Sequence, residues 1–167
     1  MSKKGQKDNI GLVLSNQFAS SWKMLRQAIK NVPDTYWSKE INDWSFSWNI
    51  YHIIETADYY KQSTPTGMEW GKRVNINLKA DSENTIKQKK AKITKDQLLG
   101  YLEEIEDQVS DLLENSSDEE LLGKDEFDDG HLIILEKILY LLRHNMHHIG
   151  ELNKALRDWQ CERIKWQ

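Results

Sequence analysis

The sequence predicts an all-α protein, a four-helix bundle, and two observations support this fold class. Four long segments carry apolar residues at alternating steps of three and four, the spacing that places them on one face of a helix. The chain has only two prolines, Pro33 and Pro65, and both fall between these segments. At 167 residues the chain is long enough for one domain with a hydrophobic core. We therefore expect a single domain over residues 1–167, with its ordered core at about 9–159.

The N-terminal half contains two of the expected helices. The first spans about residues 9–31 and ends before Pro33, which cannot continue a helix. A tryptophan-rich connection follows, and the second helix begins near Ser45 or Ser47 and ends at about Lys61. The apolar faces of these helices are formed by Leu14, Phe18, Trp22, Leu25 and Ile29 and by Phe46, Ile50, Ile53, Ala57 and Tyr60.

A long crossover, from Pro65 to about Ile93, follows the second helix. Within it Val74, Ile76 and Leu78 alternate with polar residues, which predicts a short extended segment.

The C-terminal half contains two more long helices and a brief one. Thr94 with Gln97 forms a capping box, which predicts the start of the third helix, and Ser117 with Glu120 repeats this signal for the brief helix. The last helix is expected over about residues 131–159. Two helices, one long crossover and two further helices are the arrangement of a four-helix bundle.

Charge is unevenly distributed along the chain. The formal net charge of −4 argues against general nucleic-acid binding. Residues 72–95 include eight basic and two acidic residues, whereas residues 103–129 include thirteen acidic residues and one lysine. We interpret these regions as a solvated loop and a solvated helix face. The alternative for residues 72–95 is a basic docking patch for an anionic ligand.

The sequence also bears on location and redox chemistry. The first residues are charged and lack the apolar stretch of a secretory signal, and no segment has the roughly 18 uninterrupted apolar residues of a membrane span. The single cysteine, Cys161, excludes an intrachain disulfide and a cysteine-based metal site. We therefore expect a cytoplasmic protein that does not insert into a membrane.

Two histidines of the last helix have the spacing of a metal-binding pair. His144 and His148 are four residues apart, so their imidazoles share one helix face about a turn apart. On a helical projection both lie at the edge of the apolar face, where a neighbouring helix can cover them, whereas His147 lies on the opposite side. His52, in the second helix, is a third candidate ligand. Three histidines from two helices can hold a metal ion and leave a coordination position open.

Several neighbours of these histidines are candidates for a supporting role. Glu151 follows His148 by three residues and could orient its imidazole through a hydrogen bond. His147 is expected at the surface or beside the site. His52 is flanked at helical spacing by Trp48, Glu55 and Tyr59, which suit the wall of a cleft. For the aromatic residues the alternative is ordinary core packing, and for each histidine it is a hydrogen-bonded residue at the edge of the core.

These motifs resemble those of the DinB/YfiT-like proteins. Residues 144–152, His-Asn-Met-His-His-Ile-Gly-Glu-Leu, are similar to the family's C-terminal signature His-x-x-His-His-x-Gly-Gln-Leu. The tryptophan-rich residues 44–48, followed by His52 and by Asp-Tyr-Tyr at 58–60, resemble the family's motif in helix two. The resemblance extends over about residues 10–157.

The resemblance implies an up-up-down-down four-helix bundle with a long crossover between helices two and three. It also implies a divalent metal ion, commonly nickel or zinc, held by His52, His144 and His148. Homodimers are common in this family. Two positions depart from the pattern, because Ile149 stands where a basic residue is usual and Glu151 where a glutamine is usual.

Family members with an assigned activity include transferases in which a low-molecular-weight thiol meets an electrophile at the metal. The resemblance therefore implies a metal-dependent transferase with a small-molecule substrate. Two alternatives stay open, a non-catalytic, metal-stabilised or stress-associated binding bundle and a metal-dependent hydrolase that uses water in the open coordination position.

Overall fold

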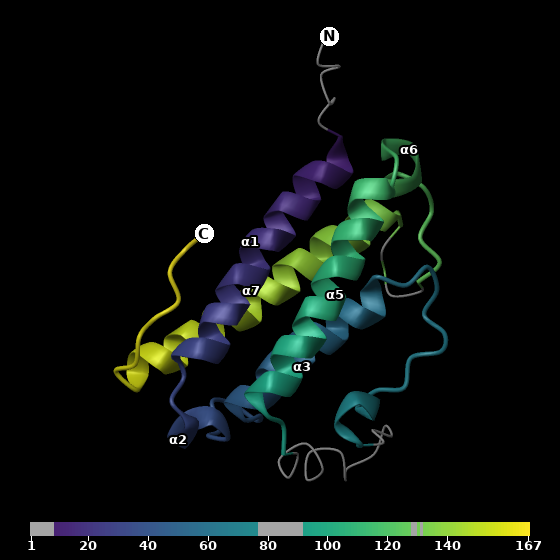
Figure 1. Cartoon of the computed structure of the whole chain (residues 1–167). Coiled ribbons are helices and arrows are strands. Elements are labelled where there is room, and N and C mark those ends of the chain that lie inside the picture. Colours follow the sequence, from purple (N-terminus) through teal and green to yellow (C-terminus); the bar gives the residue numbers. More distant parts are fainter. Residues whose placement is uncertain (1–8, 77–91, 128–129, 131) are drawn as a thin grey trace.

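Four long helices form the bundle, and shorter helices lie in the connections (Figure 1). The computed structural model describes residues 9–76, 92–127, 130 and 132–167. The predicted all-α four-helix bundle is confirmed. The long helices are α1 (Ile10–Asn31), α3 (Phe46–Tyr60), α5 (Lys95–Asn115) and α7 (Ile134–Asp158). The connections contain α2 (Asp34–Trp37), the 3₁₀ helix η1 (Lys72–Val74) and α6 (Asp118–Leu121).

Side-chain caps determine where most of these helices begin. At the start of α1 the side chain of Asn9 accepts a hydrogen bond from the backbone N–H of Leu12 at 2.8 Å. The hydroxyl of Ser45 caps α3 in the same way. Both predicted capping boxes, at Thr94 and at Ser117, are present. The helix starts predicted from these residues are therefore confirmed, whereas α7 begins a few residues later than expected.

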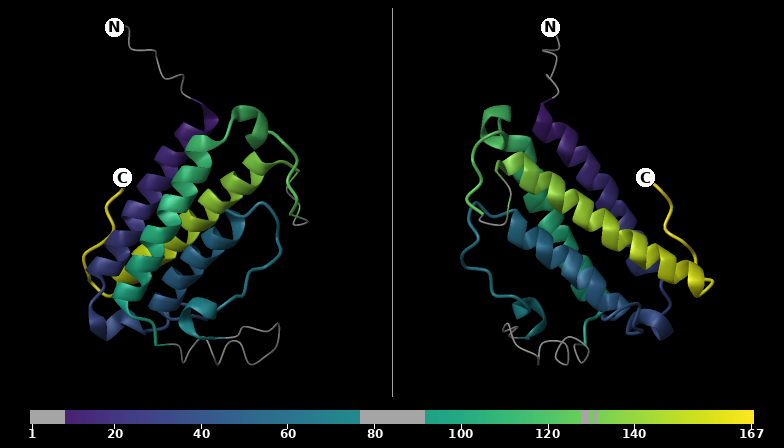
Figure 2. Two further views of the ribbon diagram at one scale, coloured as in Figure 1. Left: turned by 45° about the vertical axis from the view of Figure 1, so that its right-hand side comes forward. Right: turned by 180° about the vertical axis from the view of Figure 1, so that it is seen from behind.

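The helices run in the order up, down, down, up, as Figure 2 shows from two further sides. Ser15 near the start of α1 donates a hydrogen bond to Glu114 near the end of α5, so these helices are antiparallel. Tyr60 at the end of α3 packs on Tyr140 near the start of α7, with ring centroids 5.3 Å apart, so this pair is antiparallel too.

This order differs from the up-up-down-down order that the family resemblance implied. An up-up-down-down bundle needs two long crossovers. The chain has one, residues 61–94, and it joins α3 and α5, which run in the same direction. The shorter connections, residues 32–45 and 116–133, join helices that run in opposite directions.

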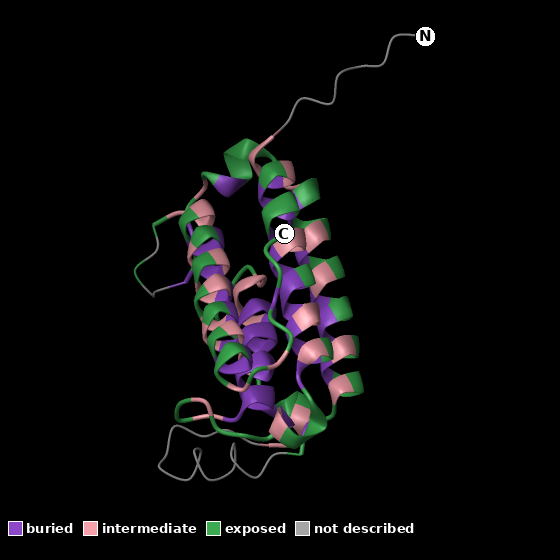
Figure 3. Cartoon of the chain, turned by 90° about the vertical axis from the view of Figure 1, so that its left-hand side faces the viewer, coloured by how far each residue is buried: buried purple, intermediate pink, exposed green. Residues whose placement is uncertain are grey.

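Helix α3 is the most enclosed element of the bundle. It packs against both α5 and α7, and α1 packs against the same two helices from the other side. Figure 3 shows the buried residues gathered on the inward faces. Twelve of the fifteen residues of α3 are buried, and the exceptions are His52, Tyr59 and Tyr60. These three residues therefore mark the one edge of α3 that the core does not cover.

One connection contains a helix that was not predicted from the sequence, and another differs from its predicted conformation. The tryptophan-rich connection contains the short helix α2, and Trp37 at its end is buried, with its indole N–H donating to the carbonyl of Ile93 at 2.6 Å. Val74 belongs to η1 rather than to an extended segment, because the flanking Gly71 and Asn75 adopt left-handed backbone conformations, with φ of 82° and 57°, that curl the chain. Leu78 lies outside the described residues, as does His131.

The oppositely charged regions meet at one described contact. The guanidinium of Arg73 forms two hydrogen bonds, of 2.7 and 2.6 Å, to the carboxylate of Glu104 on α5. The basic docking patch considered for residues 72–95 falls largely on residues 77–91, outside the described part of the chain. Within the described part, every helix is too short or too polar to cross a membrane.

Gly11 sets the closest approach of α1 to α5. A Cβ atom at this position would lie 2.0 Å from the carbonyl oxygen of Leu113, which is part of the α5 backbone and cannot move aside alone. At Gly100, on the exposed side of α5, an added Cβ would meet nothing within 4 Å. The two glycines therefore provide a matched pair of sites.

We expect Gly11→Ala to lower the free energy of unfolding by about 1–3 kcal/mol, because the helices must separate to admit the methyl group. Gly100→Ala should raise it by up to about 1 kcal/mol, because alanine favours the helix over the unfolded chain. Urea unfolding of the two variants beside the wild type measures both changes. Equal effects of the two substitutions would contradict the close approach at Gly11.

Candidate metal centre

Three imidazoles meet between α3 and α7. The Nε2 atoms of His52 and His144 lie 3.0 Å apart. The ring centroids of His144 and His148 are 4.6 Å apart, and that of His52 lies 4.9 and 5.0 Å from them. One ring nitrogen from each residue lies within 4.8 Å of the other two. The structure thus brings together the three histidines that the sequence singled out.

The local structure explains why these side chains converge. His144 and His148 are one turn apart on α7, between residues that are buried on the inward side, such as Leu141 and Ile149. His52 lies on the uncovered edge of α3, the helix antiparallel to α7. All three imidazoles are only partly accessible to solvent. The cluster is therefore placed by two helices and not by a loop.

Glu151 orients one of the three rings. The Nδ1 atom of His148 lies 2.7 Å from Oε2 of Glu151, and a carboxylate can only accept, so Nδ1 carries the hydrogen. In the neutral imidazole the other ring nitrogen, Nε2, carries no hydrogen and is available as a ligand. A carboxylate that holds the far side of a histidine in this way fixes its tautomer and increases its basicity.

His147 lies on the solvent side of His148, as the helical projection predicted, with the two ring centroids 5.0 Å apart. With His148 and Glu151 it forms a second, more exposed group of potential ligands. Its side chain is 69% exposed, and its Nε2 atom lies 3.9 Å from Oε1 of Glu151. His147 therefore shares a partner with His148 but points to the solvent. This makes His147 a natural control for substitutions at His148.

Burial keeps two imidazoles of the cluster, those of His52 and His144, neutral. Desolvation, with a further contribution from the neighbouring histidines, lowers the pKa of His52 to about 3. The same two causes, burial first and then His148, lower the pKa of His144 to about 4. Both rings are therefore unprotonated at neutral pH, which is the state that binds a metal ion.

The ring nitrogens of the cluster are not all hydrogen-bonded. Two imidazoles that face each other through Nε2 can share only one hydrogen bond, because only one of these atoms can carry the hydrogen. The Nδ1 atom of His144 is buried and has no hydrogen-bond partner among the described residues. Neutral ring nitrogens that converge but cannot all be hydrogen-bonded to one another are suited to coordinate a cation held between them.

Aromatic side chains border the cluster on two sides. The ring of Trp44 packs 4.7 Å from that of His52, and Tyr140 lies 6.2 Å from His144. Tyr140 also packs on Tyr60 of α3. Neither Trp44 nor Tyr140 was predicted from the sequence to lie beside the three histidines. For Tyr140 a signal was present, since it precedes His144 by four residues and so shares its helix face.

Two candidate wall residues lie elsewhere. Trp48 is 2% exposed and packs on Tyr51 in the core. Glu55 is buried and accepts hydrogen bonds of 2.6 Å from the hydroxyl of Tyr51 and from the backbone N–H of Gly71, and burial raises its pKa. Glu55 therefore anchors the start of the crossover to α3. Among the described residues, neither Trp48 nor Glu55 forms a hydrogen bond, ion pair or ring contact with the three histidines that would make it part of the cluster.

The third candidate, Tyr59, belongs to a separate aromatic group near the end of α3. Its ring lies 5.0 Å from Trp70 and 5.1 Å from Phe127. Next to Glu151, a cavity of about 450 Å³ is lined by Asn42 of the connection between α1 and α3 and by Trp159 at the end of α7. Glu151 links this cavity to the cluster, and Tyr60 and Tyr140 link the group around Tyr59 to His144.

Comparison with known proteins gives one match. Residues 17–152 match the DinB superfamily, a region that begins within α1, ends within α7 and contains the three histidines and Glu151. No curated protein and no solved structure matches the chain. The match covers well over half of the chain, including most of each long helix.

The depressed pKa values predict how stability depends on pH in the metal-free protein. Between pH 6.5, the ordinary pKa of histidine, and about pH 4, the unfolded chain binds more protons at His52 and His144 than the folded chain does. Stability rises with pH where this holds, so the free energy of unfolding should fall as the pH is lowered from 7 to 4.

Urea unfolding of the chelator-treated protein at several pH values measures this dependence. Over the same pH range, the free energy of unfolding of the double variant His52→Gln/His144→Gln should fall by at least about 1.4 kcal/mol less than that of the wild type. This difference corresponds to one pKa unit. Carboxylates contribute equally to both proteins and cancel in the difference. The same pH dependence in both proteins would show that these histidines are not buried in the neutral form.

Proposed function

The chain belongs to the DinB superfamily, and we propose that its three-histidine cluster binds a divalent metal ion that serves a transferase reaction. In the proposed reaction a low-molecular-weight thiol, such as bacillithiol or mycothiol, attacks an electrophilic small molecule. One observation carries the proposal. Ring nitrogens of three partly buried histidines converge from two helices, and a carboxylate orients one of them.

The donor set supports a nitrogen-binding transition metal. Imidazole suits nickel, zinc, copper and iron, and it is a poor partner for magnesium or calcium, which prefer oxygen ligands. Three protein ligands are typical of sites that keep a position open for a reactant. Among the metals that imidazole suits, we propose nickel or zinc, the metals common in the family.

The surroundings support activation of a thiol. A bound divalent cation would lower the pKa of a coordinated thiol, so that the reactive thiolate is available at neutral pH. The residues of the chain contribute position and shielding. Glu151 holds the proton on Nδ1 of His148, and the rings of Trp44 and Tyr140 cover His52 and His144 and restrict water.

The part of the chain that the structure describes offers no competing nucleophile at the cluster. The one cysteine, Cys161, directs its Sγ atom to the backbone carbonyl of Trp159 at 3.6 Å. Among the described residues it belongs neither to the three-histidine cluster nor to the group of His147, His148 and Glu151. The alternatives of a non-catalytic, metal-stabilised bundle and of a metal-dependent hydrolase use the same three histidines. The experiments below distinguish them. A cytoplasmic location and a homodimer stay predictions.

We expect the protein, purified without chelators, to contain close to one equivalent of a divalent transition metal per chain. His148→Ala should reduce the content at least tenfold, because it removes one of three ligands. His147→Ala should leave the content unchanged, because His147 points away from the cluster. Elemental analysis of the three proteins measures this.

Circular dichroism of the same samples controls for folding. The metal proposal would be contradicted if the wild-type protein contained less than about a tenth of an equivalent of nickel, zinc, iron or manganese, both as purified and after incubation with each ion. A loss at His147→Ala equal to that at His148→Ala would place the metal at the exposed His147/Glu151 side instead.

For the transferase activity, we expect the metal-loaded protein to conjugate bacillithiol to the electrophile monochlorobimane faster than the uncatalysed reaction does. His148→Ala should reduce the rate by at least about tenfold, and His147→Ala should retain most of it. Fluorescence of the bimane conjugate measures the rate.

Each other outcome identifies an alternative. Equal rates with wild-type protein and His148→Ala would remove the cluster from the chemistry. Full metal binding without turnover of any thiol or ester would favour the non-catalytic bundle. Metal-dependent cleavage of esters or amides without a thiol would favour the hydrolase.

A further inference from the structure

Two asparagines are completely buried in the described part of the chain, and only one of them is hydrogen-bonded. Asn49 of α3 donates from its amide to the backbone carbonyl of Ser45 at 2.9 Å. Asn145 lies on the inward face of α7, and neither its amide nitrogen nor its carbonyl oxygen has a hydrogen-bond partner among the described residues. A buried polar atom without a partner costs about 1–3 kcal/mol. Packing alone therefore does not account for an asparagine at this position.

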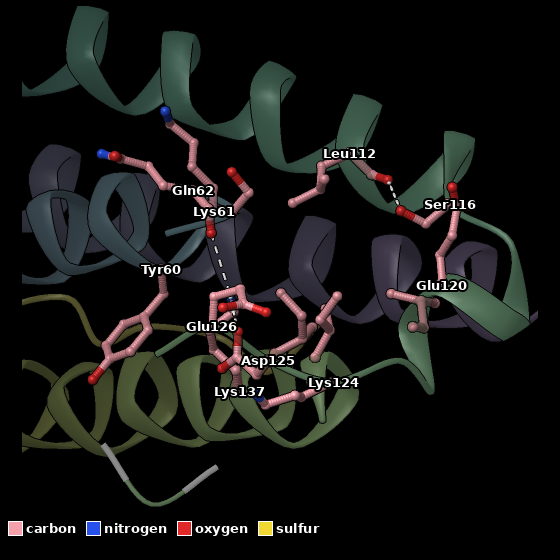
Figure 4. A pocket seen from close by; sticks show the side chains of 14 residues that line it. Tyr60, Lys61, Gln62, Leu112, Ser116, Glu120, Lys124, Asp125, Glu126 and Lys137 are labelled. Carbon is pink, nitrogen blue, oxygen red and sulfur yellow. Dashed lines mark hydrogen bonds and ion pairs between the residues drawn. The ribbon is translucent and has the colours of Figure 1, made fainter. Parts of the chain in front are cut away.

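The charged side chains that the bundle buries have partners. Glu55 and Asp58 each accept a hydrogen bond of 2.6 Å from a tyrosine hydroxyl. At the end of α3, Asp125 and Lys137 form an ion pair of 2.8 Å in the wall of a cavity of about 290 Å³ (Figure 4). Asn145 differs from all four, because it has neither a hydrogen-bond partner nor an ion-pair partner among the described residues.

Another unpaired atom belongs to the residue directly before Asn145. Within the described residues, Nδ1 of His144 is buried without a partner, and Nε2 of the same ring faces His52 at 3.0 Å. Burial is the main cause that lowers the pKa of His144, and the side chain of Asn145 opposes it. An amide has this effect when its carbonyl oxygen lies near a ring nitrogen and stabilises the hydrogen there. Because Nε2 faces His52, the ring nitrogen near Asn145 is Nδ1.

The unpaired atoms of the two residues are complementary when Nε2 of His144 serves as a metal ligand. The hydrogen of the neutral imidazole is then on Nδ1, which becomes a buried donor that needs an acceptor. The carbonyl oxygen of Asn145 is a buried acceptor that needs a donor. Glu151 already accepts from Nδ1 of His148 at 2.7 Å in this way.

We propose that Asn145 is a positioning residue of the metal centre, whose carbonyl oxygen accepts the hydrogen on Nδ1 of His144 and so keeps Nε2 free for the metal. This role rests on the proposed binding of a metal ion by the three histidines. It gives each histidine of α7 its own acceptor, a neutral amide for His144 and a carboxylate for His148. Both acceptors fix the tautomer that a metal needs.

The zinc affinity of Asn145 variants, measured by competition with a chromophoric chelator, tests this role. Asn145→Leu and Asn145→Ala both remove the acceptor, but they change the side-chain volume in opposite directions. Both should weaken zinc binding by about 10–100-fold, the usual effect of removing a group that orients a ligand. Asn145→Asp keeps an acceptor oxygen and should bind zinc at least about tenfold more tightly than Asn145→Leu.

A change of packing on the same face of α7 provides the control. Leu141 is completely buried one turn before Asn145, and methionine has nearly the same volume as leucine. Leu141→Met should therefore bind zinc as tightly as the wild type. Circular dichroism of every variant controls for folding.

NMR of the zinc-loaded full chain, with its histidines labelled with ¹⁵N, detects the hydrogen itself. In the wild type, the hydrogen on Nδ1 of His144 should give a signal, because the hydrogen bond to Asn145 slows its exchange with water. In Asn145→Leu this signal should move upfield or disappear, whereas the signal of the hydrogen on Nδ1 of His148 should stay. A residue that only packs in the core would leave both signals in place.

Some outcomes would overturn the role of Asn145 and leave the metal centre intact. They are wild-type zinc affinity in both Asn145→Leu and Asn145→Ala, an unchanged signal of His144, or an Asn145→Asp variant as weak as Asn145→Leu. Equal weakening by Leu141→Met would assign the effect to packing. If the wild type binds no zinc, or binds it equally well after His148→Ala, the metal centre itself is wrong, and the role of Asn145 with it.

Discussion

The packing of α3 against α7 is the constraint on which both the histidine cluster and the cavity beside Lys137 depend. Because α3 is enclosed on nearly all sides, its only uncovered edge carries His52, Tyr59 and Tyr60. Antiparallel packing places this edge beside one stripe of α7, where the helical repeat of about seven residues puts Lys137 and His144 in line. The crossing of the two helices therefore forms the histidine cluster, and the early end of α3 leaves the cavity beside Lys137.

The histidine cluster and the Asp125–Lys137 ion pair beside the cavity accommodate buried polar groups in different ways. In the histidine cluster, burial lowers the pKa of two imidazoles and leaves neutral donors that a cation can use. Glu151 adds a negative charge behind His148, where the family pattern has a neutral glutamine. A carboxylate makes the imidazole a stronger donor to a metal than an amide does. In the cavity, a full ion pair is buried instead, and it leaves one carboxylate oxygen unsatisfied.

Much of the fold could be predicted from local sequence, because caps and apolar spacing act within one or two turns. Thr94 and Ser117 mark helix starts in this way, and the i, i+4 spacing of His144 and His148 placed both on one face. The order of helix directions was taken from the family resemblance and was wrong, although the single long crossover that the sequence places after the second helix already favours α3 and α5 running in the same direction. The inward position of Trp48 and the contact of Trp44 with His52 depend on how α3 rotates against its neighbours.

X-ray absorption spectroscopy at the edge of the bound metal tests the central claim most directly, because it counts the imidazole ligands. In protein loaded with zinc or nickel, we predict three imidazole nitrogen ligands at about 2.0–2.1 Å, with light atoms in any remaining positions. His147→Ala should give the same spectrum, and His52→Ala should lose one imidazole. In the absence of any thiol compound, a sulfur ligand, or a wild-type spectrum with fewer than three imidazoles, would contradict a metal centre formed by His52, His144 and His148.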